Sequence, residues 1–430
     1  MIDFFSSTRW VMAPEADGFD GAVIFAAGLP LHTLERRNLD QHPHLARRLL
    51  DPQVYLSGLD VARSTDACTK LASYGWFDAE APVFDSSAQK QSEWRGAVRA
   101  DVVNTWTGRV PTDPQVIENR VRVCIETQQR LGCEAIILPS PLTTDVSTNF
   151  AAELVWLDIG LELAKRIAPG VPRLATIALS DTCIQGVDPW SSASLDTLLD
   201  QVSSREPEGA YVVIEQASHD QLYETTANTL GTLVRLVRDL RAGRISKVVV
   251  PHAGVAGMLG AAVGAQIWST GWYRGQRRLR LSEIEDSDDI KLAIPTYYSH
   301  ALAGEIHLRT DLDTINAGGL LDLVADETAA SSGLLRALRK KGGVVASVPA
   351  WEHKKGNTSA ARQHFASALI RETATMRALR VEDRLDAAKR WLDNAIRVAT
   401  KVSALGDFNP RTALGHQRAW RAVLDSATTP

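Results

Sequence analysis

GAYVVIEQ at residues 209–216, KVVVPH at residues 247–252 and AQIWST at residues 265–270 are the stretches that decide the fold of this 430-residue chain. Each is a short, mostly apolar run rich in Val, Ile or Ala. Such runs, without polar alternation, are typical of strands in a parallel sheet that helices cover on both faces. Helical patterns at Gln221–Leu240 and Gly254–Val263 separate the three runs. The segment therefore predicts parallel strands joined by helical crossovers.

The same alternation extends toward the N-terminus. Five more runs have this apolar character: Gly21–Gly28, Val54–Leu59, Ala81–Ser86, Glu134–Pro141 and Arg173–Ser180. Helical patterns occur at Leu34–Leu50, Thr65–Tyr74, Pro114–Leu131, Phe150–Ile167 and Ser194–Val202. Eight strand–helix units predict an α/β fold, a closed (β/α)8 barrel of the TIM type over residues 1–290. Residues 87–112 do not fit the alternation, and we expect them to form a long loop or lid over the barrel mouth.

The pattern changes after the eighth strand. Residues 295–307 predict a strand or hairpin, and helical periodicity follows at residues 361–379, 382–404 and 412–424. We therefore expect a C-terminal extension over residues 291–430 that is largely helical.

The charge of the chain is divided unevenly along its length. Residues 331–430 hold 18 Lys and Arg against 8 Asp and Glu, a balance of +10, whereas the remainder holds 29 basic and 43 acidic residues, a balance of −14. Such asymmetry indicates either a polyanionic partner, such as a nucleic acid, or attraction between the two parts of the chain. A protein partner for the basic helices is a third explanation of the same uneven charge distribution.

Several classes of protein are disfavoured by composition. The four cysteines show no C-x-x-C spacing, so neither a disulfide framework nor a zinc knuckle is expected, and scattered thiols fit the cytoplasm. Residues 1–18 lack the apolar core of a signal peptide. The apolar stretch 248–268 is broken by Pro251 and four glycines, which argues against a membrane span. His42 and His44 fall outside any expected strand end, and we expect neither a metal nor another cofactor.

Candidate catalytic residues come from the strand ends. Active sites of (β/α)8 barrels lie at the C-terminal ends of the strands, and four acid–base side chains are expected there: Asp85, Asp181, Glu215 and His252. Carboxylates and imidazoles carry most general acid–base catalysis. The structural alternative is that Asp181 caps a helix or turn and that His252 donates a hydrogen bond inside the core.

Candidate ligand-binding residues lie at the same end of the barrel. Gly254 and Gly257 join the seventh strand to a short helix, and such a loop can bind phosphate through backbone N–H groups. Other residues expected to bind the ligand are Ser140, Ser269, Thr270 and Arg274. Tight packing of small residues is the alternative for the glycines. Trp268–Arg280 (WSTGWYRGQRRLR) combines aromatic and arginine side chains, which suits a nucleic acid or a rim paired with the acidic residues 283–289.

Asp85-Ser86-Ser87-Ala88-Gln89 resembles the D-S-G-G-F-Q motif of the tRNA-guanine transglycosylase barrels and their DNA-modifying relatives. The strand order and the arginine-bearing loop after the eighth strand are similar too, and the resemblance covers roughly residues 20–280. Asp85, Ser86 and Gln89 occupy the matching positions of that motif, and the resemblance implies binding of a nucleobase or nucleotide. The family's nucleophilic aspartate would fall near Trp268–Ser269, where this chain has no carboxylate, and its zinc cysteine cluster is absent.

Two functions fit these observations. The first is a barrel enzyme, such as a transglycosylase-like transferase, that acts on a nucleobase-containing or phosphorylated ligand at the barrel mouth. The second is a non-catalytic barrel that binds nucleic acid or a protein through its basic C-terminal helices.

Overall fold

Eight parallel strands form a nearly closed barrel in the computed structural model, which describes residues 1–8, 17–77, 91–216, 223, 226–243, 245–286, 295–308, 310–352 and 358–428. The strands are β1 (Asp3–Thr8), β2 (Gly21–Phe25), β3 (Arg48–Asp51), β4 (Ile136–Ile137), β5 (Arg173–Leu179), β6 (Gly209–Ile214), β7 (Lys247–Val250) and β8 (Ile267–Thr270). Their order is β3-β2-β1-β8-β7-β6-β5-β4. The N–H of Glu134, just before β4, donates to the carbonyl of Arg48 in β3, at 3.0 Å, and this bond joins the two ends of the sheet.

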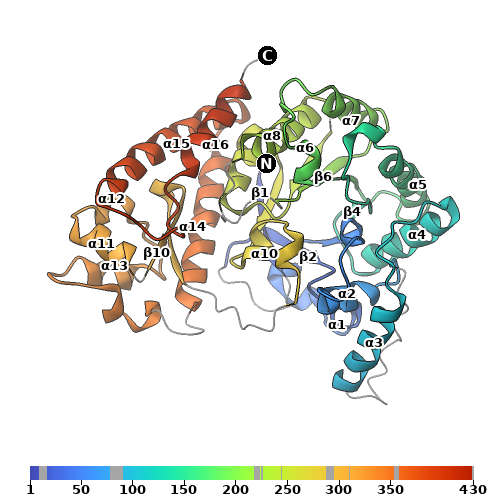
Figure 1. Cartoon of the computed structure of the whole chain (residues 1–430), viewed down its shortest axis with the longest axis horizontal. Coiled ribbons are helices and arrows are strands. Elements are labelled where there is room, and N and C mark those ends of the chain that lie inside the picture. The colour runs from blue at the N-terminus through green and yellow to red at the C-terminus, as the bar shows by residue number, and fades with distance from the viewer. Residues whose placement is uncertain are drawn as a thin grey trace.

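Helices surround the barrel, as Figure 1 shows. In the N-terminal two thirds of the chain they are α1 (Leu31–Glu35), α2 (Thr65–Ala72), α3 (Gln91–Thr105), α4 (Pro114–Arg130), α5 (Ala151–Ile167), α6 (Asp181–Ile184), α7 (Ala193–Ser203), α8 (Ala227–Ala242), α9 (Gly257–Val263) and α10 (Arg274–Arg277). Local signals explain where some of them begin. Pro114 occupies the first turn of α4, and the side chain of Asp113 accepts a hydrogen bond from the N–H of Gln115 at 2.8 Å, which is the usual capping arrangement.

Three expectations about the first third of the chain were wrong. Val54–Leu59 is not a strand, because Gln53 adopts a left-handed φ of 53° and turns the chain into the 3-10 helix η3 (Val54–Leu56). Residues 34–50 are not one helix: α1 ends at Glu35 and the segment closes with β3. The expected loop at residues 87–112 contains α3. The expected strand Ala81–Ser86 lies outside the described residues.

The strands β1 and β3 lie outside the predicted strands. Both are short and mix polar with apolar residues, DFFSST in β1 and RLLD in β3, so neither stands out as an apolar run. Pairing makes them strands: β1 lies between β2 and β8, and β3 hydrogen-bonds along β2.

The C-terminal extension consists of one hairpin and a set of helices. Strands β9 (Thr296–Ser299) and β10 (Gly304–His307) pair antiparallel. The helices are α11 (Asp311–Ala317), α12 (Leu321–Val324), α13 (Ser332–Leu338), α14 (Ser359–Ala378), α15 (Val381–Ser403) and α16 (His416–Ser426). α15 packs on α9 and α16 on α8, along one side of the barrel (Figure 1). In the described part of the chain, no helix is both long and apolar enough to cross a membrane.

An ionic network closes the N-terminal end of the barrel. Arg47 bridges Asp3 of β1 and Glu134 at 2.8 Å each, and Lys247 of β7 reaches Glu134 at 3.4 Å. Residues at the N-terminal end of a (β/α)8 barrel usually contribute to stability rather than to catalysis. The opposite, C-terminal end therefore holds the candidate site.

Candidate functional site

Asp51, the last residue of β3, is the most perturbed acid at the C-terminal end of the barrel. Its side chain is 1% exposed. The hydroxyls of Tyr55 and Tyr211 donate to its Oδ2 at 2.5 and 2.8 Å, and the N–H of Gln53 donates to its Oδ1 at 3.0 Å. Burial raises the pKa of Asp51 to about 6, because desolvation outweighs these three hydrogen bonds. A carboxyl with this pKa can exchange a proton near neutral pH.

Gln53 ties this acid to the neighbouring strand. Its side-chain oxygen accepts from the N–H of Ala27, just after β2, at 2.8 Å. The left-handed turn at Gln53 is therefore supported by a side-chain bond, and the turn brings Tyr55 back over Asp51. Residues in such sparsely populated conformations cluster at functional sites.

Glu215, directly after β6, is a second buried acid at this end. It is 5% exposed and accepts a hydrogen bond of 2.7 Å from the hydroxyl of Ser180. Desolvation is the main cause of its raised pKa, and the charge of Asp181 adds to it. Side chains alternate along a strand, so Glu215 lies on the same face of β6 as Tyr211, whose hydroxyl reaches Asp51 inside the barrel.

His252 lies two residues after β7 and is 4% exposed. Its ring stacks on Phe25, the last residue of β2, with a centroid distance of 4.0 Å and an interplanar angle of 10°. The backbone of His252 has a left-handed φ of 49°. His252 and Phe25 thus form a stacked aromatic pair at the mouth of the barrel.

The other expected residues occupy separate positions at this end. Asp181 is the first residue of α6, fully buried, and its neighbour Ser180 caps that helix. Ser140, Ser269 and Thr270 are buried, and Ser269 accepts a hydrogen bond from Ser7 of β1 at 3.0 Å.

Asp85 and Gln89 lie outside the described residues. By sequence they belong to the connection that leaves the C-terminal end of β3 and leads to α4.

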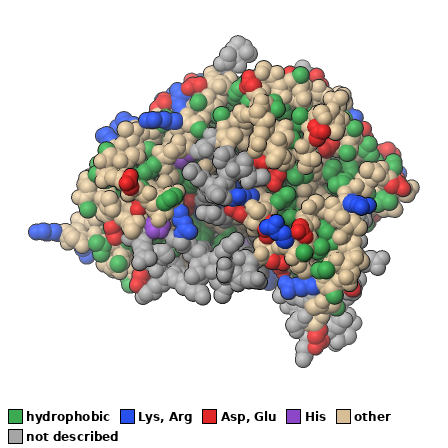
Figure 2. All heavy atoms as spheres, in the orientation of Figure 1, with side chains coloured by type: hydrophobic (Ala, Val, Ile, Leu, Met, Phe, Trp, Pro, Cys, Tyr) green, Lys and Arg blue, Asp and Glu red, His purple; other side chains and the backbone are tan. Residues whose placement is uncertain are grey.

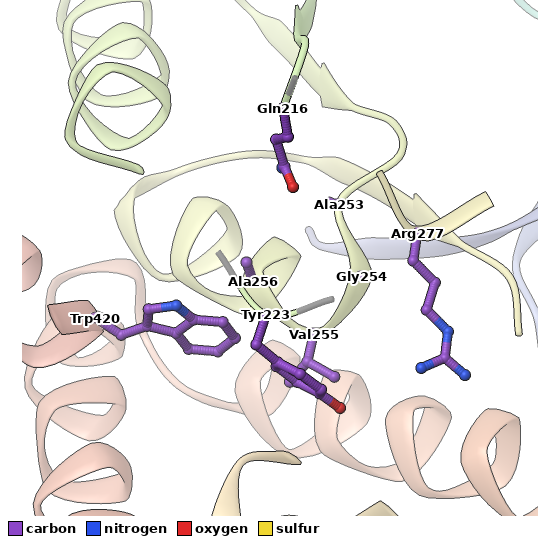
Figure 3. Close-up of a pocket in the computed structure, with 8 residues that line it drawn as sticks. All are labelled: Gln216, Tyr223, Ala253, Gly254, Val255, Ala256, Arg277 and Trp420. Atoms are coloured by element: carbon purple, nitrogen blue, oxygen red, sulfur yellow. The ribbon is translucent and has the colours of Figure 1, made fainter. Parts of the chain in front are cut away.

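A pocket lies where the loop after β7 meets the extension (Figure 3). Its empty space, including the part open to solvent, is about 300 Å³. The lining residues are Gln216, Tyr223, Ala253, Gly254, Val255, Ala256, Arg277 and Trp420. Figure 3 shows the Gln216 side chain directed toward the loop, with Tyr223 and Trp420 on the opposite side of the loop. The loop that the sequence predicts to bind phosphate therefore borders a pocket. Two residues that line it, Gln216 and Ala253, directly follow Glu215 and His252 in the chain.

Gly254 and Gly257 are required for different structural reasons. Gly254 has a left-handed φ of 54° and its Cα faces Arg277, whose carbonyl oxygen would lie 3.2 Å from an added Cβ. At Gly257, the first residue of α9, a Cβ would lie 2.2 Å from the ring of Trp268. Close packing explains Gly257, whereas Gly254 lines the pocket.

Two of the arginines after β8 form ion pairs with acids. Arg277 forms a buried ion pair with Glu305 of β10, and Arg278 pairs with Glu283. Trp268 is buried under α9. The pairing with residues 283–289 that the rim interpretation expects is present at Arg278, whereas Arg277 pairs with an acid of the C-terminal hairpin instead. Arg274 begins α10.

Comparisons and metal-binding geometry add no further assignment. No group of three or more His, Cys, Asp or Glu side chains suited to a metal occurs within the described ranges. No protein-family model matches the chain, and no curated protein matches it either.

Sequence analysis missed Asp51, Tyr55 and Tyr211. The available signal is an aspartate that closes a short apolar run in RLLDPQ, but helical periodicity over residues 34–50 hides this strand. Tyr211 stands in the middle of a predicted strand, and only its partner across the barrel marks it out.

Proposed function

We propose that this chain is an enzyme that carries out proton transfer on a small ligand at the C-terminal mouth of the barrel. The observation that supports this most directly is the pair Asp51 and Glu215. Both acids are buried, and the pKa of each is raised. Asp51 is the last residue of β3 and Glu215 directly follows β6, so both lie at the C-terminal ends of barrel strands. Perturbed acids gathered at the functional end of a fold are typical of active sites.

Each acid has a defined role in this proposal. Asp51 accepts or donates the proton, since its pKa of about 6 leaves both protonation states populated near neutral pH. Tyr55 and Tyr211 orient its carboxylate. Glu215 serves the other side of the ligand as a hydrogen-bond partner or second acid, oriented by Ser180.

A nucleobase-containing or phosphorylated compound is the ligand class that we propose. Ring N–H groups of a base suit carboxylate acceptors such as Asp51 and Glu215. A phosphate would lie by the loop at Gly254. Transglycosylase-like chemistry, as the resemblance implies, needs a carboxylate nucleophile, and in this chain Asp51 or Glu215 would supply it.

Ligand screening with matched variants tests the proposal. We expect nucleobases, nucleosides or sugar phosphates to raise the melting temperature of the wild type, and Asp51→Asn or Glu215→Gln to abolish the shift while the proteins stay folded. Asp200→Asn, an exposed acid on α7, is the control and should retain it. Incorporation of isotope-labelled base into nucleic acid then tests base exchange. Unchanged ligand shifts in both barrel variants would exclude these acids from the site.

A further inference from the structure

The C-terminal extension carries more positive charge than nearby carboxylates neutralise. Its last hundred residues have a balance of +10, against −14 for the remainder. Ion pairs account for some of the basic side chains: Arg339 with Asp322, Arg371 with Asp326, Arg377 with Asp20, Arg380 with Asp383, Lys389 with Asp425, and Arg421 with Asp393. The remaining exposed cations decide what the surface can bind.

Three of these cations form a row on α15. Arg390, Arg397 and Lys401 are exposed, and none makes an ion pair with a carboxylate of the described residues. Arg397 donates a hydrogen bond to the side-chain oxygen of Asn394, at 2.5 Å. Spacings of seven and four residues place all three on one helix face, and a rise of about 1.5 Å per residue makes the row about 16 Å long.

Helix α16 adds a fourth cation beside this row. The pairs Lys389–Asp425, at 3.3 Å, and Arg421–Asp393, at 2.8 Å, show that α15 and α16 run antiparallel. Arg418, exposed and one turn before Arg421, therefore lies level with the stretch of α15 around Arg397. We call Arg390, Arg397, Lys401 and Arg418 the basic face.

Acidic neighbours offset part, and not all, of the charge of the basic face. Asp393 and Asp425 are held by Arg421 and Lys389, and Asp386 is a further exposed acid on this side of α15. Figure 2 shows Lys and Arg side chains along the upper-left edge of the molecule, over α15 and α16, with acidic side chains among them.

We propose that the basic face binds the phosphate backbone of a nucleic-acid duplex, without regard to base sequence. A duplex is a stiff, dense polyanion, and a straight helix presents a rigid row of cations to it. The acidic balance of residues 1–330 repels such a partner from the barrel, which confines docking to the extension. Stacking on single-stranded bases would need exposed aromatic rings. Trp391 of α15 is instead stacked on His300, at 5.7 Å, with its indole N–H bonded to the carbonyl of His300.

Titration of the full chain with a mixed-sequence duplex of about 20 base pairs tests the proposal. Fluorescence anisotropy at about 50 and 200 mM salt should show binding that weakens steeply, because each neutralised phosphate releases counterion. The triple variant Arg390→Gln, Arg397→Gln, Lys401→Gln should bind at least about tenfold more weakly and lose about two to three units of the log–log salt slope.

A second triple variant, which removes the same number of positive charges, serves as the control. Arg336→Gln, Lys340→Gln and Lys341→Gln remove three exposed cations at the end of α13 and should change the affinity by less than about threefold. Circular dichroism checks that both variants fold; if the α15 variant does not, Arg418→Gln alone should still reduce the salt slope by about one.

Four results would overturn the proposal. These are equal losses in the two triple variants, no duplex binding at low salt, binding that ignores salt, or tighter binding of a single strand or an acidic polypeptide than of the duplex. None of them bears on the barrel acids, so failure here is distinguishable from failure of the proposed enzyme.

Discussion

The hydroxyl of Tyr211 on β6 donates a 2.8 Å hydrogen bond to the carboxylate of Asp51 at the end of β3. These strands are not neighbours in the sheet, since β4 and β5 separate them on one side. The bond therefore crosses the barrel interior and links two walls through a titratable group. Both partners are buried, so a change of charge at Asp51 affects the stability of the whole barrel.

Stability should fall with rising pH because of Asp51. Its pKa is about 6 in the folded chain, above the usual 3.8, so the folded state binds the proton more tightly. The contribution is complete below about pH 4 and is lost as the pH rises through about 6, with a total of about 3 kcal/mol. Urea unfolding between about pH 4 and 7 should give similar stabilities for the wild type and Asp51→Asn at low pH, where Asp51 is neutral, and curves that separate as the pH rises, because only the wild type then carries a buried charge. Asp200→Asn should follow the wild type; parallel curves for Asp51→Asn would refute the assignment.

Loss of the Ser180 hydroxyl should raise the pKa of Glu215 further. That hydroxyl donates to the Glu215 carboxylate and stabilises its charged form, while burial opposes ionisation. We expect Ser180→Ala to move the carboxyl titration, followed by infrared difference spectroscopy, to higher pH. Ser191→Ala, an exposed serine near α7, should leave it in place. The band must disappear in Glu215→Gln; if it stays, it belongs to another acid.

Breaking the Arg277–Glu305 pair should be costly. Burial opposes the charge on Glu305, but Arg277, Thr296 and Tyr223 hold its pKa below the usual value. Glu305→Gln leaves Arg277 as a buried cation without a counter-charge, and we expect a loss of about 3–5 kcal/mol in unfolding free energy. The double variant Arg277→Met, Glu305→Leu should recover much of it. A small loss in the single variant would show that the pair is not desolvated in solution.

Gly257→Ala should destabilise the barrel by packing alone. The added methyl would lie 2.2 Å from the Trp268 ring, which forces α9 or the indole to shift at a cost of about 1–3 kcal/mol or more. Gly333 of α13 meets nothing within 4 Å, so Gly333→Ala should be neutral or stabilising. Thermal unfolding of the two variants compares them directly, and equal melting temperatures would show that the α9 contact is loose.

The amino-acid sequence by itself determined the class of fold and much of its course. Six predicted strands are present, as are the helices predicted between the fourth and eighth of them, because apolar runs with helical spacers specify parallel strands through local patterning. The hairpin at residues 296–307 and the long helices α14 to α15 follow for the same reason. Glu215 and His252 were found because a strand end can be located from the run before it.

Only the tertiary structure decided which side chains meet. β1 and β3 are strands because neighbours supply their hydrogen bonds, and neither DFFSST nor RLLD carries that information alone. Asp51 becomes a perturbed acid through Tyr211, which lies 160 residues away in the chain. Arg277 is neutralised by Glu305, from a hairpin beyond the barrel. Burial and charge pairing depend on distance in space, which residue patterns along the chain do not encode.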